Sequence, residues 1–144
     1  MRLTMRTNLA MRTLMFCAAN KGRTVRKAEI AASCDASENH LAQVIHKLAQ
    51  AGFVTTVRGR KGGLQLRRDP AQLRVGEIVR FFEGAVPLTE CMVHKADTCP
   101  VVGCCVMKDA FCDALEAFYA SLDGRTLADL VNQNAGLVSL LKVA

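Results

Sequence analysis

The sequence predicts a mainly α-helical protein with a small β-hairpin wing, arranged as a winged helix-turn-helix followed by a long helix. Three observations predict this fold. Apolar residues recur every three or four positions in several segments, residues 26–51 are typical of two helices joined by a tight turn, and two strand-like segments flank a turn rich in glycine and cations. We expect the winged helix-turn-helix over residues 1–84, a cysteine-bearing loop over 85–105, and a long helix with a tail over 106–144.

The first expected element is an amino-terminal helix whose apolar residues, between positions 9 and 18, recur at helical spacing. Thr7 or Asn8 can cap its start, because a side-chain oxygen there accepts a hydrogen bond from a free N–H of the first turn. The segment Asn20-Lys21-Gly22 is expected to end this helix, since glycine and asparagine disfavour its continuation.

The helix-turn-helix is predicted from a short helix over 26–32, a turn over 34–37 and a second helix over 38–51. Ser37 is a good N-cap for the second helix, which Gly52 ends. In such folds the second helix enters the major groove of DNA and presents polar side chains to base edges. The candidate DNA-reading residues on its outward face are Ser37, Asn39, His40, Gln43 and Lys47.

A β-hairpin is predicted from strands over 53–57 and 64–67, joined by three glycines interleaved with three cations. Such a wing suits a narrow minor groove, where the negative potential of DNA is concentrated. Its cations Arg58, Arg60 and Lys61 are therefore candidate DNA contacts. A further helix is expected over 75–83.

The charge distribution points to a polyanionic partner for the first half of the chain alone. Residues 1–80 hold 15 of the 19 Lys and Arg but 5 of the 13 Asp and Glu, whereas the remainder is acidic. A basic domain joined to the helix-turn-helix and wing patterns favours double-stranded DNA as partner. The alternatives are a basic domain that is merely soluble and a winged helix used for protein contacts.

Seven cysteines, an odd number at irregular spacing and without a secretory signal before them, argue against a disulfide framework. No segment approaches the length of a membrane span, so we expect a cytoplasmic protein that does not contact membranes. We expect Cys17, Cys34 and Cys112 to be structural.

Three loop cysteines, Cys91, Cys99 and Cys105, are the candidate metal ligands, because thiolates are soft ligands that hold iron–sulfur clusters. Their spacing differs from the Cys-x2-Cys pattern of common structural zinc sites. Zinc or a metal-free thiol redox switch explains them nearly as well, and Cys104 competes with Cys105 as the third ligand.

The long helix, expected over 105–122, carries an apolar stripe that either packs into its own core or pairs across a homodimer. We favour the homodimer, since the small basic domain already has a core of its own. The sequence has no glycine-rich phosphate loop and no convincing catalytic Ser/His/Asp or Cys/His arrangement, so we expect no enzyme activity.

The chain resembles the family of winged-helix iron–sulfur regulators that includes the NsrR, RirA and IscR types. The resemblance is carried by the segments MRLTMRTNLAMRTLM, HLAQVIHKLAQAGFVTTVRGRKGGLQL, CPVVGCCVMKDAF and LDGRTLADLV. It implies a homodimer paired through the long helix, a pseudo-palindromic operator, and a cluster held by the three loop cysteines in each subunit. The resemblance thereby selects Cys105 over Cys104 as the third ligand.

Among these types, HLAQVIHKL, the wing and TLADLV are most similar to the NsrR type, a nitric-oxide-responsive repressor. The resemblance implies a cluster that is 4Fe–4S rather than 2Fe–2S, whose nitrosylation releases the operator. Its fourth ligand in NsrR types can be a carboxylate from the partner subunit, and the matching position here is Asn8, as in the iron-responsive RirA type. The alternatives are therefore a RirA-like iron-responsive regulator and a metal-free thiol redox-sensing repressor.

Overall fold

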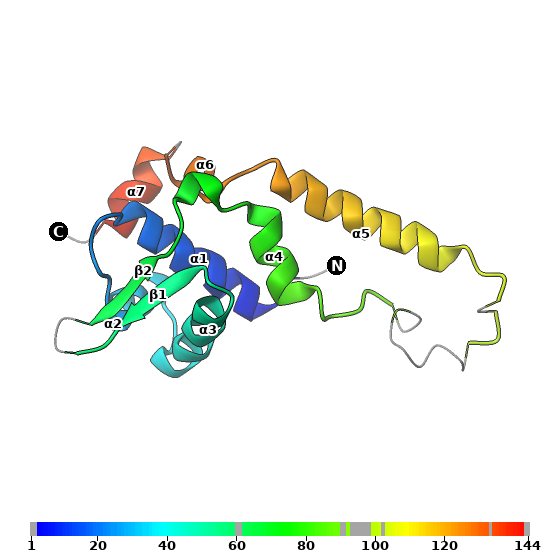
Figure 1. Cartoon of the computed structure of the whole chain (residues 1–144), viewed down its shortest axis with the longest axis horizontal. Helices are drawn as coiled ribbons and strands as arrows, with labels where there is room; N and C mark the ends of the chain where they lie inside the picture. Colours follow the sequence, from blue (N-terminus) through cyan, green and yellow to red (C-terminus); the bar gives the residue numbers. More distant parts are fainter. Residues whose placement is uncertain are drawn as a thin grey trace.

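The computed structural model describes residues 3–59, 62–89, 92, 99–101, 103–132 and 134–142. In chain order its elements are α1 (Met5–Ala19), α2 (Lys27–Cys34), α3 (Glu38–Gln50), β1 (Val54–Val57), β2 (Gly63–Leu66), the 3-10 turn η1 (Pro70–Gln72), α4 (Val75–Glu83), α5 (Met107–Asp123), α6 (Leu127–Asn132) and α7 (Ala135–Leu141). The expected winged helix-turn-helix followed by a long helix is confirmed (Figure 1).

Helix α1 lies at the centre of the domain and packs against α2, α3, α4, α6, α7 and β2. Its Leu14 and Phe16 are fully buried, in one apolar core with Leu41 and Leu48 of α3 and Leu64 of β2. The helix begins earlier than the sequence suggested. Its cap is Thr4, whose hydroxyl accepts the Thr7 N–H at 3.3 Å, so the expected cap at Thr7 or Asn8 is wrong.

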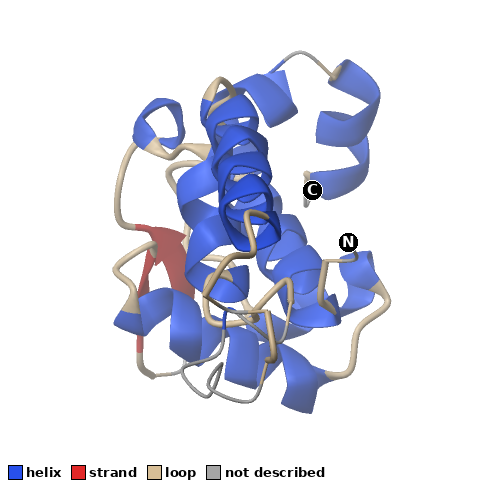
Figure 2. Ribbon diagram, turned by 90° about the vertical axis from the view of Figure 1, so that its right-hand side faces the viewer, coloured by secondary structure: helices blue, strands red, loops and turns tan. Residues whose placement is uncertain are grey.

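Strands β1 and β2 form an antiparallel hairpin with Val54 opposite Leu66 and Val57 opposite Gly63. A single bridge between Val25 and Leu64 fastens the hairpin to the segment before α2, with both backbone hydrogen bonds at 2.8–3.0 Å. Figure 2 draws the hairpin at the edge of a helical body. The wing therefore has a fixed base on the helix-turn-helix.

Helix α5 projects away from the helical body formed by α1 to α4, and its amino-terminal end points away from that body (Figure 1). Its carboxyl-terminal half packs on α4, through Tyr119 against Val75 and Val79. Within the expected carboxyl-terminal tail, residues 135–141 form helix α7, whose Leu141 carbonyl accepts a 2.8 Å hydrogen bond from Asn20. No helix among the described residues is both long and apolar enough to cross a bilayer.

The joint between α4 and α5 depends on close backbone approach at Gly76. The Asp123 carboxylate accepts the Glu77 N–H at 2.9 Å and so caps α4, which has no capping side chain of its own. A Cβ at Gly76 would press into that carboxylate and into the Tyr119 carbonyl oxygen. Beside it, the Arg80 guanidinium bonds Glu116 at 2.7 Å and lies 4.2 Å from the centre of the Tyr119 ring.

We predict that Gly76→Ala destabilises the fold by about 1–3 kcal/mol, because the added methyl group must push α5 away from α4. The free energy of unfolding, measured by urea denaturation, checks this. The control is Gly103→Ala, since a Cβ at Gly103 meets no atom within 4 Å. Equal losses in the two variants would contradict a tight joint at Gly76.

Candidate nucleic-acid interface and cysteine loop

The start of α3 is built by local backbone chemistry. Asp35 ends α2 in the left-handed region, with φ of 48°, which turns the chain sharply toward α3. The Ser37 hydroxyl then accepts the His40 N–H at 3.2 Å, so the expected N-cap is confirmed. Because Leu41, Val44, Ile45 and Leu48 are buried, the opposite face of α3 is fixed toward solvent.

The candidate DNA-reading residues lie on that solvent-facing side. Ser37, Asn39, Gln43 and Lys47 are exposed, and His40 is half-buried. An exposed polar face at the start of a capped helix is the shape that fits a major groove. Their contacts with bases stay a prediction.

Sequence reasoning missed two polar contacts at the start of α2, one that joins it to α3 and one that caps α2 itself. Lys27 pairs with Glu38 of α3 at 3.0 Å, and the Glu29 carboxylate accepts the Arg26 N–H at 2.7 Å. That backbone hydrogen bond lowers the pKa of Glu29, with further lowering by Arg23. The signal was available, because Glu29 stands three residues after Arg26, the spacing at which an acidic side chain reaches back to a helix start.

The wing turns through Gly59, which has φ of 111°, a conformation that favours glycine. Gly62 donates its N–H to the Gly59 carbonyl at 2.8 Å and closes the turn. Arg58 is exposed at the end of β1. The other two candidate wing contacts, Arg60 and Lys61, lie outside the described residues.

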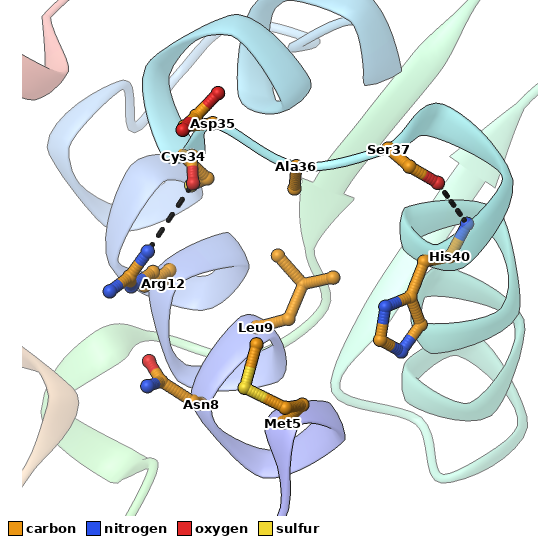
Figure 3. Close-up of a pocket in the computed structure, with 9 residues that line it drawn as sticks. All are labelled: Met5, Asn8, Leu9, Arg12, Cys34, Asp35, Ala36, Ser37 and His40. Carbon is orange, nitrogen blue, oxygen red and sulfur yellow. Dashed lines mark hydrogen bonds between the residues drawn. The ribbon is translucent and has the colours of Figure 1, made fainter.

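A pocket of about 260 Å³ lies between α1 and the amino-terminal end of α3. Figure 3 shows the Arg12 side chain on α1 reaching Cys34 at the start of the turn, with Asn8 on the same helix and His40 across the pocket on α3. Arg12 donates a 3.3 Å hydrogen bond to the Cys34 carbonyl. Asn8, the candidate fourth ligand position, is thus exposed on α1 next to the helix-turn-helix.

Two of the three candidate metal ligands are described. Cys99 and Cys105 are half-buried, whereas Cys91 lies outside the described residues. Among the residues that the structure describes, no group of three His, Cys, Asp or Glu is gathered closely enough to hold a metal ion. Helix α5 begins at Met107, so the expectation that Cys105 opens this helix is wrong, because the chain stays irregular until Val106.

The thiols of the loop differ in their surroundings. Among the described residues, Cys99 and Cys105 have no hydrogen-bond partner, while the Cys104 thiol lies 3.6 Å from the Val101 carbonyl oxygen. Cys17 and Cys34 are buried, as expected for structural residues, but Cys112 is exposed on α5. Burial raises the pKa of the Cys17 thiol to about 12.

Comparison with known proteins decides the family. The family model for Rrf2, described as an iron-dependent transcriptional regulator, matches residues 3–133. The chain belongs to the Rrf2 family. It is 38% identical to the HTH-type transcriptional regulator NsrR of Geobacillus kaustophilus (strain HTA426), over 99% of this chain and 97% of that protein. It is equally identical to NsrR of Bacillus subtilis (strain 168), over 99% of both.

Solved structures support the same fold. CymR, the global cysteine regulator of B. subtilis, superposes with a TM-score of 0.73 at 23% identity, covering 93% of this chain and 98% of its own, which shows the fold alone. T. potens IscR superposes with a TM-score of 0.69 at 27% identity, covering 92% and 88%. The chain is therefore an NsrR-type Rrf2 transcriptional regulator, and the expectation that it is no enzyme is confirmed.

We predict that the cysteines of the native protein are alkylated at different rates at pH 8. Cys112 and Cys104 are exposed and should react quickly, whereas Cys17 should stay unmodified until the protein unfolds, because its raised pKa leaves almost no thiolate. Peptide mass spectrometry after timed iodoacetamide treatment checks this. Modification of Cys17 as fast as of Cys112 would contradict its place in the core.

Proposed function

We propose that this Rrf2 protein is a homodimeric repressor that binds a pseudo-palindromic operator and senses nitric oxide through an iron–sulfur cluster. The observation that carries the DNA-reading part is the exposed polar face of α3, capped by Ser37 and presented beside a cationic wing. Support for the nitric-oxide signal comes from the near-full-length identity with two NsrR proteins.

The donor set of the loop fits an iron–sulfur cluster. Cys99 and Cys105 keep part of their surface open and their thiols are uncommitted among the described residues, which suits ligation by thiolate. The Cys104 thiol has a weak 3.6 Å contact with the Val101 carbonyl, and the resemblance to NsrR-type proteins favours Cys105 as the third ligand. With Cys91, these residues would hold the cluster, one per subunit, and we favour 4Fe–4S over 2Fe–2S.

When bound, the cluster would supply iron to which nitric oxide can add. The chain would provide three thiolates for the cluster, and Asn8, at the matching fourth position, offers a neutral amide, which is a weak iron ligand. One iron would therefore lack a strong protein ligand. Asn8 is exposed, so a cluster in the partner subunit can approach it. A weak fourth donor lets a small exogenous ligand compete for that position.

The proposed homodimer rests on the projecting half of α5. Val106 and Met107 are 78% and 52% exposed, and Ala110 and Ala114 continue an open apolar strip along the same helix. Apolar surface of this kind is stabilised by burial against a second copy. Because the joint at Gly76 fixes α5 to α4, a shift of α5 in the dimer would move the reader helices apart or together.

An iron-responsive function is the second candidate. It is favoured by Asn8 in place of a carboxylate and by the family's description as iron-dependent regulators. Anaerobic native mass spectrometry of the recombinant dimer, titrated with nitric oxide, separates the two. Stepwise nitrosyl adducts with parallel operator release support the nitric-oxide signal. A cluster that ignores nitric oxide but is lost to a mild chelator supports iron, and a metal-free dimer after reconstitution supports thiol chemistry.

We predict that Cys99→Ser abolishes the cluster, since a serine hydroxyl is a poor ligand for iron. The visible absorbance and iron content of the anaerobically purified variant check this, with Cys112→Ser as the matched control on α5. A Cys99→Ser protein that keeps the cluster would count against the ligand assignment.

We predict that Arg58→Ala weakens operator binding and lowers the slope of log affinity against log salt by about 1, because one phosphate contact is lost. Binding is measured by fluorescence anisotropy at several salt concentrations. The control is Arg125→Ala, which removes the same charge from the turn between α5 and α6, away from the wing. Arg60→Ala should behave as Arg58→Ala does, and unchanged binding in both wing variants would remove the wing from the interface.

A further inference from the structure

The last residue of α4, Glu83, joins two parts of the chain that lie 79 residues apart. Its carboxylate accepts the Thr4 N–H at 2.8 Å, the Thr4 hydroxyl at 2.9 Å and the Thr7 hydroxyl. These three hydrogen bonds, together called the Glu83 latch, fasten the first turn of α1 to the end of α4.

The Glu83 carboxylate interacts favourably with the dipole of α1 and unfavourably with that of α4. A negative charge at the carboxyl-terminal end of α4 opposes the dipole of that helix, but it complements the amino-terminal end of α1. Helix α1 has no acidic residue in its own first turn. Burial by itself would raise the pKa of Glu83, but the hydrogen bonds from Thr7 and Thr4 lower it overall, so the carboxylate is charged at neutral pH.

The latch is shielded from water. Glu83 is 8% exposed and Thr7 is fully buried. A small apolar hollow of about 160 Å³ lies against it, lined by Leu3, Val86, Leu115 and Phe118 among others. A buried carboxylate favours the arrangement of its neighbours in which its hydrogen bonds are made. Any arrangement that breaks these bonds leaves the charge buried without partners, which is unfavourable.

The Glu83 latch lies between the cysteine loop and the helix on which α3 packs. The cysteine loop leaves the domain at Gly84, the residue directly after Glu83, and Asn8 directly follows Thr7 on α1. Helix α1 shares one apolar core with α3, the reader helix. One carboxylate therefore links the root of the loop to the helix on which the reader is packed.

We propose that the Glu83 latch couples the state of the cysteine loop to the DNA-reading domain. This inference rests on the proposed function. With the latch closed, the first turn of α1 is held in the geometry that supports operator binding. A rearrangement of the loop pulls on Gly84 and Glu83, loosens the hydrogen bonds to Thr4 and Thr7, and frees that turn. Glu83 is a positioning residue, and it does not ligate the cluster.

The test is Glu83→Gln, which keeps the side-chain shape but removes the charge, together with Thr7→Val, which removes one hydroxyl donor at nearly constant volume. The quantity measured is the ratio of operator Kd after nitric oxide to operator Kd before it, in cluster-bearing protein. We expect the cluster absorbance to be unchanged and the ratio to fall by about fivefold toward one in Glu83→Gln, and by less in Thr7→Val. Amide exchange over residues 4–8 should be faster in both variants before nitric oxide is added.

The control is Glu77→Gln, the same chemical change on the same helix, where the carboxylate pairs at 2.6 Å with Arg68 rather than with α1. Its ratio should match that of the wild type. A cluster-bearing Glu83→Gln or Thr7→Val protein with the wild-type ratio overturns the latch while the proposed function stands. A wild type without a cluster, or with a cluster but a ratio of one, overturns the proposed function and the inference with it.

Discussion

The burial of α1 is the constraint on which the rest of the structure depends. This helix touches both helices of the reader pair, α4, the last two helices and one strand of the wing. Each large side chain that it buries fully, such as Phe16 or Leu14, contributes roughly 1.5–3 kcal/mol relative to an exposed position. Because the reader, the wing base and the root of the cysteine loop all pack on this one helix, none of them can shift far without disturbing it.

The exposed face of α3 and the start of α5 lie at different ends of the molecule (Figure 1). The exposed face of α3 and the base of the wing belong to the basic first half of the chain, while the described residues just before α5 lie at the far end of that helix (Figure 1). Two polar joints bridge the distance between them. Asp123 fixes α5 to α4, and Glu83 fixes α4 to α1. If the loop receives the signal as we propose, that signal has one route along α5 and a shorter route through Glu83, and both routes meet at α4.

Sequence reasoning predicted the fold and the family, but it missed the contacts that connect the helices. The Ser37 cap, the buried face of α3 and the bounds of α4 follow from short-range patterns, so they could be predicted. Glu83 was overlooked because its partners lie far away in the sequence. A negative residue at the end of a helix, where its own dipole disfavours it, is the signal that could have found it.

The sequence by itself determined the elements whose hydrogen bonds are local, such as the capped helix α3 and the glycine turn of the wing. Tertiary structure decided what depends on distant partners. Thr4 rather than Thr7 caps α1, and the Thr7 hydroxyl instead donates to Glu83 in the interior. Helix α7 has its own local cap at Asn134, but the hydrogen bond from Asn20 to the Leu141 carbonyl fixes it against the end of α1. The physical reason is the range of the interactions: caps and turns are satisfied within four residues, whereas a buried carboxylate or an apolar face needs a partner that only the folded chain supplies.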